Sequence, residues 1–248
     1  MTNELCRLLE WDTEFFGRRI GRVVGARLTE EMASRALGWC EDCRIDCLYF
    51  LADPSDPVTA GVAEDNGFRL VDVRMTLGRR LRAKPAPAHG RGAVSVRSFA
   101  PDDLPTLREL ARQNHTDSRF YFDGAFPPSR CDALYETWIA KSCDGYADAV
   151  LVAHGQERPA GYITCVVDDD GRGEIGLVGV APEVRGQGVG TSLVEAAVEW
   201  FADNGVEHVR VVTQGRNVAA QRLYQKCGFL AESVELWFHR WFPRRELA

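Results

Sequence analysis

The sequence predicts a mixed α/β fold in which helices flank one central mixed β-sheet, with a smaller α/β domain before it. Three observations predict this fold. Strand-like and helix-like patterns alternate from residue 93 to the end of the 248-residue chain. An apolar strand pattern, Glu174–Val180, leads through a glycine-rich turn into an amphipathic helix pattern. In the first 85 residues, Gly67-Phe68 precedes an alternating segment, much as Gly228-Phe229 precedes the last strand pattern.

The first elements of the larger domain follow from the spacing of apolar residues. Residues 93–99 alternate as a strand. Pro101-Asp102-Asp103 then opens a helix with Leu107 and Leu110 on one face. The other elements expected before residue 172 are a helix at 131–142, strands at 149–153 and 160–167, and a hairpin turn at 168–171.

The elements after Glu174–Val180 follow in the same way. A helix is expected to run to about residue 203, because apolar residues recur every four positions from Val189 to Phe201 and Asn204-Gly205 is typical of a helix end. The last expected elements are a strand at 206–213, a helix at 217–226 and a strand at 233–242.

A change of composition at 79–92 indicates a domain boundary. Pro, Ala, Gly and basic residues dominate there, and the hydrophobic periodicity stops. We therefore expect an N-terminal domain at 1–85, a linker at 86–92 and the larger domain at 93–248. The basic residues form either a solvated linker or a patch for phosphates. The N-terminal domain is either a degenerate copy of the larger one or shares only a common helix-ending signal with it.

Charge and composition exclude several classes of protein. A net charge of −6 disfavours non-specific nucleic-acid binding, and a hydrophobic content of 45% is ample for a packed core. Charged residues occur throughout Met1–Trp11, unlike in a signal peptide. No apolar run approaches the ~20 residues that span a bilayer. We therefore expect a cytoplasmic protein without membrane insertion.

The eight cysteines are not expected to form disulfides in a chain without an export signal. Cys40, Cys43 and Cys47 have a spacing that fits either metal ligands or one face of a helix. Because a structural zinc site normally needs four ligands and no fourth lies at the right spacing, we expect no metal site.

The turn Arg185-Gly186-Gln187-Gly188-Val189-Gly190 predicts a phosphate site made of main chain. Glycines at the mouth of a helix let backbone N–H groups approach an anion, and the helix N-terminus adds partial positive charge. The dinucleotide fingerprint needs glycine where Thr191 or Leu193 stands, and the P-loop pattern needs a lysine that is absent, so both motifs fail. The alternative is a plain connection between a strand and a helix.

The pattern Arg185-x-x-Gly188-x-Gly190, after a strand ending in Val-x-Pro, resembles the acetyl-CoA signature of the GNAT acetyltransferase superfamily. The resemblance implies acetyl-CoA as the cofactor, with the strand splayed from its neighbour and the pantetheine amides paired to its free edge. Val178 and Val180 would offer backbone groups to pantetheine and the acetyl group. The cofactor-binding residues that the resemblance implies are Val178, Gly179, Val180, Arg185, Gly186, Gln187, Gly188, Val189, Gly190, Thr191 and Asn217.

A second pattern, Asn217-x-x-Ala220-x-x-x-Tyr224 followed by Gly-Phe, also resembles this family. It implies that Tyr224 is the general acid near the CoA sulfur, because a phenol with a pKa near ~10 holds its proton at neutral pH. The alternative is a packing tyrosine, since Leu223 and Cys227 share its apolar stripe. Asn217 would contact the cofactor or simply cap the helix.

Glu174 is the candidate general base, because it opens the cofactor strand, where some members of the family place a carboxylate. Two alternatives stay open. Glu174 is a solvated strand end, or a chain of water molecules takes the proton from the amine.

The segment Arg119-Phe120-Tyr121-Phe122, between two helical patterns, is expected to form a wall of the acceptor pocket. Aromatic faces stack on sugars or bases, and an arginine can bind a phosphate with two hydrogen bonds. The alternative is a buried loop. Trp138 is the remaining candidate for binding the acceptor.

A closer resemblance, to the bacterial TDP-fucosamine acetyltransferases, is carried by residues 9–17, Ser118-Arg119-Phe120, 135–139 and 161–163. It implies direct acetyl transfer in a ternary complex to the amine of a nucleotide-linked amino-deoxy sugar, a small-molecule acceptor used for polysaccharide, with a homodimer left open. The complete glycine turn and the residues after Phe120 depart from those enzymes. The alternatives are acetylation of a peptide N-terminus or a small amine, and a non-catalytic acyl-CoA sensor.

Overall fold

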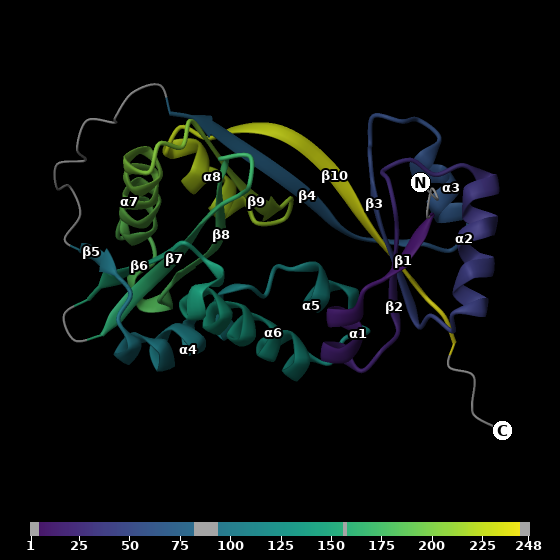
Figure 1. The fold of residues 1–248 in the computed structure, drawn as a ribbon, viewed down its shortest axis with the longest axis horizontal. Helices are drawn as coiled ribbons and strands as arrows, with labels where there is room; N and C mark the ends of the chain where they lie inside the picture. Colours follow the sequence, from purple (N-terminus) through teal and green to yellow (C-terminus); the bar gives the residue numbers. More distant parts are fainter. Residues whose placement is uncertain (1–4, 82–93, 156–157, 244–248) are drawn as a thin grey trace. The chain divides into compact units, whose positions relative to one another are not determined.

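The computed structural model describes residues 5–81, 94–155 and 158–243 (Figure 1). It confirms the predicted mixed α/β fold with one sheet flanked by helices. The predicted linker, 86–92, lies outside the described residues.

The elements before residue 115 are β1 (Cys6–Leu8), α1 (Glu10–Phe16), β2 (Ile20–Val23), α2 (Glu30–Asp42), β3 (Cys47–Ala52), α3 (Thr59–Asp65), β4 (Arg69–Arg80), β5 (Ser95–Ser98), η1 (Pro101–Asp103) and α4 (Leu104–Asn114). Those after it are α5 (Arg119–Asp123), α6 (Pro128–Lys141), η2 (Ser142–Tyr146), β6 (Ala149–His154), β7 (Pro159–Val167), β8 (Gly173–Val180), η3 (Pro182–Val184), α7 (Val189–Asp203), β9 (His208–Gln214), α8 (Val218–Lys226) and β10 (Leu230–Trp241).

The strands form one mixed sheet in the order β1-β2-β3-β10-β4-β9-β8-β7-β6-β5. The pairs β2–β3 and β8–β9 are parallel, whereas β6–β7 and β7–β8 are antiparallel hairpin neighbours. Contacts divide the chain into two compact units that do not follow a single cut in the sequence. Unit 1 holds the residues up to Arg74, residues 118–126 and those from Val234 on, and unit 2 holds Met75–Asp117 and Pro127–Ser233.

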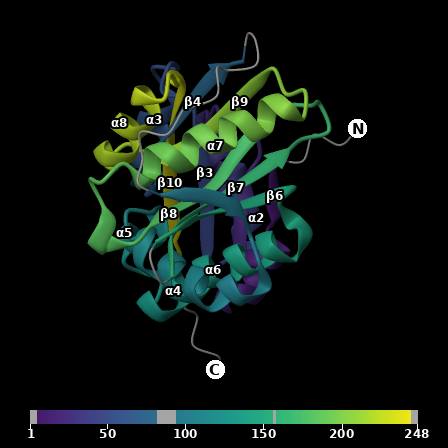
Figure 2. The ribbon, with the colours of Figure 1, turned by 90° about the vertical axis from the view of Figure 1, so that its left-hand side faces the viewer.

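In unit 2, helices cover both faces of the sheet. Helices α7 and α8 lie on one face, and α4 and α6 lie on the other, as the two views of the ribbon agree (Figure 2). The predicted stripe of α7 is confirmed, because Val189, Leu193, Ala197 and Phe201 are all buried. These side chains pack against apolar residues of β7, β8 and β9 in one hydrophobic core.

In unit 1, alternate residues of β3 point to opposite faces of the sheet. Leu48 and Phe50 pack with α2 and α3 in one hydrophobic cluster. On the other face, α1 and α5 contribute Phe16 and Phe120 to an aromatic cluster, in which the ring centroids of Phe16 and Phe126 are 4.5 Å apart. The segment that sequence analysis expected to form either a pocket wall or a buried loop contains the short helix α5.

The positions of Cys40, Cys43 and Cys47 differ from the alternative in which they share one face of a helix. Cys40 lies in α2, but Cys43 follows the end of that helix and Cys47 begins β3, so the three do not share a helix face. The chain turns at Arg44, whose φ of 50° is left-handed. Within the described residues, no group of three or more His, Cys, Asp or Glu side chains is arranged to hold a metal ion.

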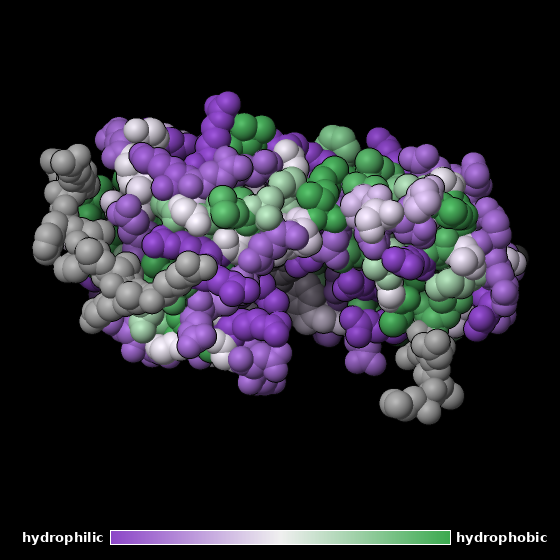
Figure 3. Space-filling model, turned by 90° about the horizontal axis from the view of Figure 1, so that it is seen from above, coloured by the Kyte–Doolittle hydropathy of each residue, from purple (hydrophilic) through white to green (hydrophobic). Residues whose placement is uncertain are grey.

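Among the described residues, no helix has the length and apolar character needed to span a membrane. Hydrophilic side chains cover much of the face seen in Figure 3, and hydrophobic residues show between them. A surface with some exposed apolar atoms is normal for a folded protein.

Candidate active site

The first feature of the candidate site is the end of the ladder between β8 and β9. The parallel pairing joins Gly173 to Val209 and ends where Ile175 faces Val211. Strand β8 continues to Val180 and stays paired with β7, since Val180 faces Gly161. In the described part of the chain, the β9 side of β8 beyond Ile175 therefore pairs with no strand. Such a free edge can hydrogen-bond an extended ligand.

A β-bulge accounts for the divergence of the two strands. Ile163 faces Val178 and Cys165 faces Ile175, so β8 has one more residue than β7 between these pairs. The Thr164 hydroxyl accepts the amide of Leu177 at 2.8 Å and closes the irregularity. A bulge bends its strand and increases the local twist, which turns β8 away from β9.

The amides of β8 alternate between its two edges. The Leu177 and Ala181 amides donate on the β7 side, the latter to the carbonyl of Ala160 at 2.8 Å, so the amides of Val178 and Val180 face the free edge. The Val180 amide already donates to Asn114 Oδ1 at 3.1 Å. Arg185 also donates to Asn114 Oδ1, at 3.0 Å, and to the Val180 carbonyl, at 3.3 Å. Of these two amides, only that of Val178 is thus available to donate to a ligand.

Gly179, between these two valines, lies directly against an aromatic side chain. A Cβ at Gly179 would overlap the ring of Tyr162, so only glycine fits there. The Tyr162 hydroxyl lies 3.0 Å from His115 Nε2, and the His115 ring stacks on Tyr135 at 4.4 Å. Burial lowers the pKa of His115 to about 4, which leaves a neutral imidazole beside Tyr162.

The glycine turn presents unbonded main-chain amides. Gly186 and Gly188 have φ values of 78° and 88°, which favour glycine, and Gly188 is the N-cap of α7. Gly190 brings α7 close to α8, because a Cβ there would lie 3.1 Å from the Leu223 side chain. Across the described residues, no protein acceptor is recorded for the backbone amides of Gly186, Gly188, Val189, Gly190 and Thr191.

This turn therefore has the properties of an anion site. Its amides gather at the N-terminus of α7, whose 15 residues carry a partial positive charge at that end. Arg185, Gly186, Gln187 and Gly188 are exposed, so an anion can reach the amides. The Gln187 amide differs from its neighbours because it donates to the Val184 carbonyl at 3.3 Å.

Tyr224 lies on α8 in the same hydrophobic cluster as Val178, Val180 and Val189. The residue is 5% exposed, and its ring centroid is 6.0 Å from that of Phe229. Burial raises the pKa of the phenol, so it stays protonated at neutral pH. The hydroxyl has no hydrogen-bond partner among the described residues, and its role as general acid stays a prediction.

Asn217 is the N-cap of α8, and its side chain accepts the amide of Ala220 at 3.0 Å. The structure thus shows the helix-capping alternative. A contact between Asn217 and the cofactor stays a prediction.

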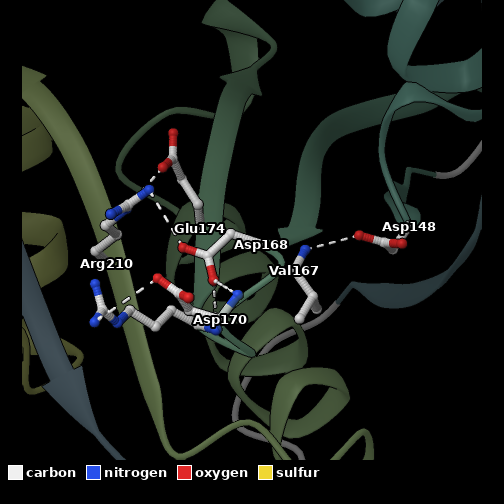
Figure 4. A network of polar contacts seen from close by, with 7 residues as sticks. Asp148, Val167, Asp168, Asp170, Glu174 and Arg210 are labelled. Atoms are coloured by element: carbon white, nitrogen blue, oxygen red, sulfur yellow. Dashed lines mark hydrogen bonds and ion pairs between the residues drawn. The ribbon is translucent and has the colours of Figure 1, made fainter. Parts of the chain in front are cut away.

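Glu174 lies at the other end of β8, in an ion-pair network (Figure 4). Its carboxylate accepts Arg210 Nε at 2.7 Å, and Arg210 also lies 3.7 Å from Asp168. Val178 lies four positions further along the strand, a distance of about 13 Å in extended backbone. The role of Glu174 as general base stays a prediction, and its exposed carboxylate, 38% accessible and paired with Arg210, fits the alternative of a solvated strand end.

The predicted acceptor-binding residues fall in two units. Arg119, Phe120, Tyr121 and Phe122 form most of α5 in unit 1, where Phe120 is buried and Phe122 is 52% exposed. Trp138 lies on α6 in unit 2, with its ring centroid 5.3 Å from that of Tyr135.

Sequence reasoning missed Asn114, Thr164 and the pair His115–Tyr162. Asn114 lies 66 positions before the amide that it binds. No local sequence pattern links the two residues.

The geometry can now be compared with known proteins. Residues 107–229 match the profile of the Acetyltransferase (GNAT) family, and this range contains the free edge of β8, the glycine turn and Tyr224. These residues are a GNAT acetyltransferase domain. Acetyl-CoA is the acetyl donor of the GNAT family.

Three relatives indicate the range of activities around this GNAT domain. The spore coat polysaccharide biosynthesis protein SpsD of Bacillus subtilis is 29% identical over 59% of this chain and 50% of its own length. The dTDP-fucosamine acetyltransferase of Escherichia coli is 30% identical over 56% of this chain and 59% of its own length. A mycothiol acetyltransferase of Saccharopolyspora erythraea is 25% identical over 88% of this chain and 72% of its own length. The matches thus span between half and three fifths of the first two relatives.

A solved structure extends the similarity of fold beyond the GNAT domain. A GCN5-related N-acetyltransferase from Sphaerobacter thermophilus has a TM-score of 0.68 with 20% identity, over 98% of this chain and 78% of that one. At this identity the likeness concerns the fold. It includes the N-terminal residues that the family profile does not match.

Proposed function

We propose that the chain is an acetyl-CoA-dependent N-acetyltransferase that acts on the amine of a nucleotide-linked amino-deoxy sugar. The observation that carries the transfer reaction is the free edge of β8 next to a turn with five unbonded amides. The names of two relatives, one for dTDP-fucosamine and one for a spore coat polysaccharide, support the class of acceptor. A cytoplasmic location, a homodimer and a degenerate GNAT-like N-terminal half stay predictions.

In the proposed mechanism, residues of unit 2 hold the acetyl donor by its two ends. The amides of the glycine turn bind the pyrophosphate, as expected for a helix N-terminus. The Val178 amide donates to the thioester carbonyl and stabilises the negative charge that develops on its oxygen. Acetyl-CoA supplies an activated acetyl group when it is bound.

The acceptor amine then attacks the carbonyl directly in a ternary complex. A nitrogen–carbon bond forms and the carbon–sulfur bond breaks. Tyr224 gives its proton to the departing sulfur, and a base or a chain of water molecules takes the proton from the amine. The phenolate of Tyr224 recovers a proton from solvent before the next turnover.

A second candidate acceptor is the one used by mycothiol acetyltransferases. The match to the relative of that name covers 88% of this chain, against 56% for the dTDP-fucosamine acetyltransferase. Peptide N-termini, small amines and a purely acyl-CoA-sensing role are the remaining alternatives.

The experiment is a thiol-release assay with acetyl-CoA and a panel of acceptors. The panel contains nucleotide-linked amino sugars, the acceptor of the mycothiol acetyltransferases, simple amines and peptides. We expect turnover with nucleotide-linked amino sugars. Turnover with peptides alone would overturn the proposed acceptor, and CoA binding without turnover on any amine would favour a sensor.

A further inference from the structure

One face of the unit 1 sheet brings several arginines together around a tryptophan. Arg22 comes from β2, Trp237 from β10 and Arg119 from α5. The Arg22 guanidinium lies 5.1 Å from the centre of the Trp237 ring, and the Arg119 guanidinium lies 4.3 Å from it. We call Arg7, Arg22, Arg74 and Arg119 the arginine cluster, because Arg7, Arg74 and Arg119 each repel Arg22 electrostatically.

Buried neighbours hold Arg119 in one orientation. Its guanidinium also lies 4.4 Å from the centre of the Tyr49 ring. It donates to His239 Nε2 at 2.7 Å. Since arginine cannot accept a hydrogen bond, the Nε2 atom is the acceptor and Nδ1 of His239 donates to Asp123 at 2.7 Å. Arg119 therefore donates to a neutral imidazole rather than to a carboxylate.

The carboxylates near the arginine cluster do not balance it. Arg74 forms an ion pair with Glu235. Asp12 faces Arg22 and Arg119, but burial raises its pKa in spite of both arginines. The four arginine charges of the cluster are thus faced by two carboxyl groups, those of Glu235 and Asp12. Within the described residues, Arg22 has no ion pair or hydrogen bond, and burial followed by its arginine neighbours lowers its pKa.

A second polar group at this place lacks a hydrogen-bond acceptor. The Tyr49 side chain is fully buried, at 0% exposure, and its hydroxyl donates to no described residue, while the Arg119 side chain interacts with that hydroxyl as a donor. Tyr49 faces Arg22 in the β2–β3 register and carries Arg119 over its ring. Buried polar groups and half-buried charges are costly without partners, so both observations indicate a ligand that supplies hydrogen-bond acceptors.

We propose that the arginine cluster, centred on Arg22, Arg119 and Trp237, binds a phosphate group of the acceptor. Guanidinium groups match phosphate oxygens with two parallel hydrogen bonds, and two of them can hold a diphosphate. The inference rests on the proposed function, in which the acceptor is a nucleotide-linked sugar. It adds that unit 1 recognises the anionic part of that acceptor, and it favours a phosphate-bearing acceptor over an uncharged one.

The experiment titrates the full chain with thymidine diphosphate, thymidine and inorganic pyrophosphate by calorimetry, with CoA present in excess to fill the glycine turn. We expect thymidine diphosphate to bind, thymidine to bind far more weakly, and Arg22→Gln to weaken the diphosphate by about tenfold or more, as for a lost hydrogen bond between charged groups. Arg22→Lys should recover part of the affinity, because it restores the charge but not the planar fork. Pyrophosphate shows whether the phosphates suffice without the nucleoside.

Arg35→Gln is the matched control, because Arg35 lies in the same unit with its side chain 62% exposed. It should leave diphosphate affinity unchanged, and CoA affinity should be equal in all variants.

Equal diphosphate binding by the wild type and Arg22→Gln, or no diphosphate binding at all, would overturn the inference. An unchanged KM for a nucleotide-linked acceptor in Arg22→Gln would overturn it while the proposed function stands. Diphosphate binding that depends on Arg22, without transfer to any amino sugar, would leave the inference standing and overturn the proposed function.

Discussion

At the scale of single residues, Tyr224 carries the chemical step of the proposed mechanism. Tyr224→Phe keeps the ring in the core and removes only the hydroxyl. Because general acids contribute roughly 100-fold or more to rate, we expect kcat to fall by about that factor while CoA affinity stays the same. Steady-state kinetics and CoA titration measure the two quantities. A parallel loss of both would indicate a packing tyrosine.

Gly179 tests how closely the cofactor strand must approach Tyr162. The added methyl of Gly179→Ala would overlap the tyrosine ring, so β8 or Tyr162 has to move. Overpacking of this kind costs about 1–3 kcal/mol, and we expect that loss in urea unfolding together with reduced acetyl transfer. Gly38→Ala is the control, since a Cβ at Gly38 meets nothing within 4 Å. A fully active, fully stable Gly179→Ala protein would show that the contact is not needed.

His239 predicts a dependence of stability on pH. Burial lowers its pKa to about 4 in the folded chain, from 6.5 for an exposed histidine. Between these values the unfolded chain binds the proton and the folded chain does not, so stability falls as the pH is lowered from 6.5 towards 4. The slope from this group is at most about 1.4 kcal/mol per pH unit. Urea unfolding at several pH values should show a shallower slope for His239→Asn, and an unchanged slope would contradict the assignment.

At the scale of elements, we propose that the glycine turn and the helix that follows it form one anion site. Gly188→Ala places a side chain at a φ of 88°, and Gly205→Ala does the same at 75° after the end of α7. We expect similar losses of stability, about 1–2 kcal/mol each, from the left-handed strain. Only Gly188→Ala should weaken CoA binding, by about tenfold, because it disturbs amides that contact charged oxygens. Equal CoA affinities in both variants would argue against the site.

The same elements show how far sequence patterns reach. The strand at 173–180, the glycine turn, α7 and α8 were predictable because each has a local signal: apolar alternation, glycine, four-residue spacing or a capping asparagine. The bulge opposite Thr164 was not, since it depends on the register of two strands. Helix α5, with five residues, is too short for a periodic pattern.

At the scale of the whole molecule, the two units share strands rather than divide at one point in the sequence. The predicted domain 93–248 lacks Met75–Leu81, which the structure includes in unit 2. Leu77 is fully buried in the core of that unit, and the backbone amide of Leu81 donates to the backbone carbonyl of Glu207 at 2.8 Å. The composition change at 79–92 marks where periodicity stops, and it carries no information about which unit the strand before it completes.

This arrangement predicts the behaviour of a truncated chain. A fragment of residues 93–248 would expose the core that Leu77 covers, so we expect it to be cleaved rapidly by protease and to show no cooperative thermal transition. Limited proteolysis and circular dichroism of the fragment beside the full chain test this. A fragment that melts as sharply as the full chain would show that residues before 93 are dispensable for folding.

Asn114 has a consequence for how an acyl donor can lie along β8. Its side-chain oxygen already accepts a hydrogen bond from the Val180 amide, so this edge of the strand offers a ligand one free amide, that of Val178. A chain of amides that slid by two residues would meet Asn114 and find no donor. We therefore expect the donor to bind this edge in a single register, because Asn114 blocks the next amide. In that register, the distance from the pyrophosphate to the thioester carbonyl fixes the position of the acyl carbon.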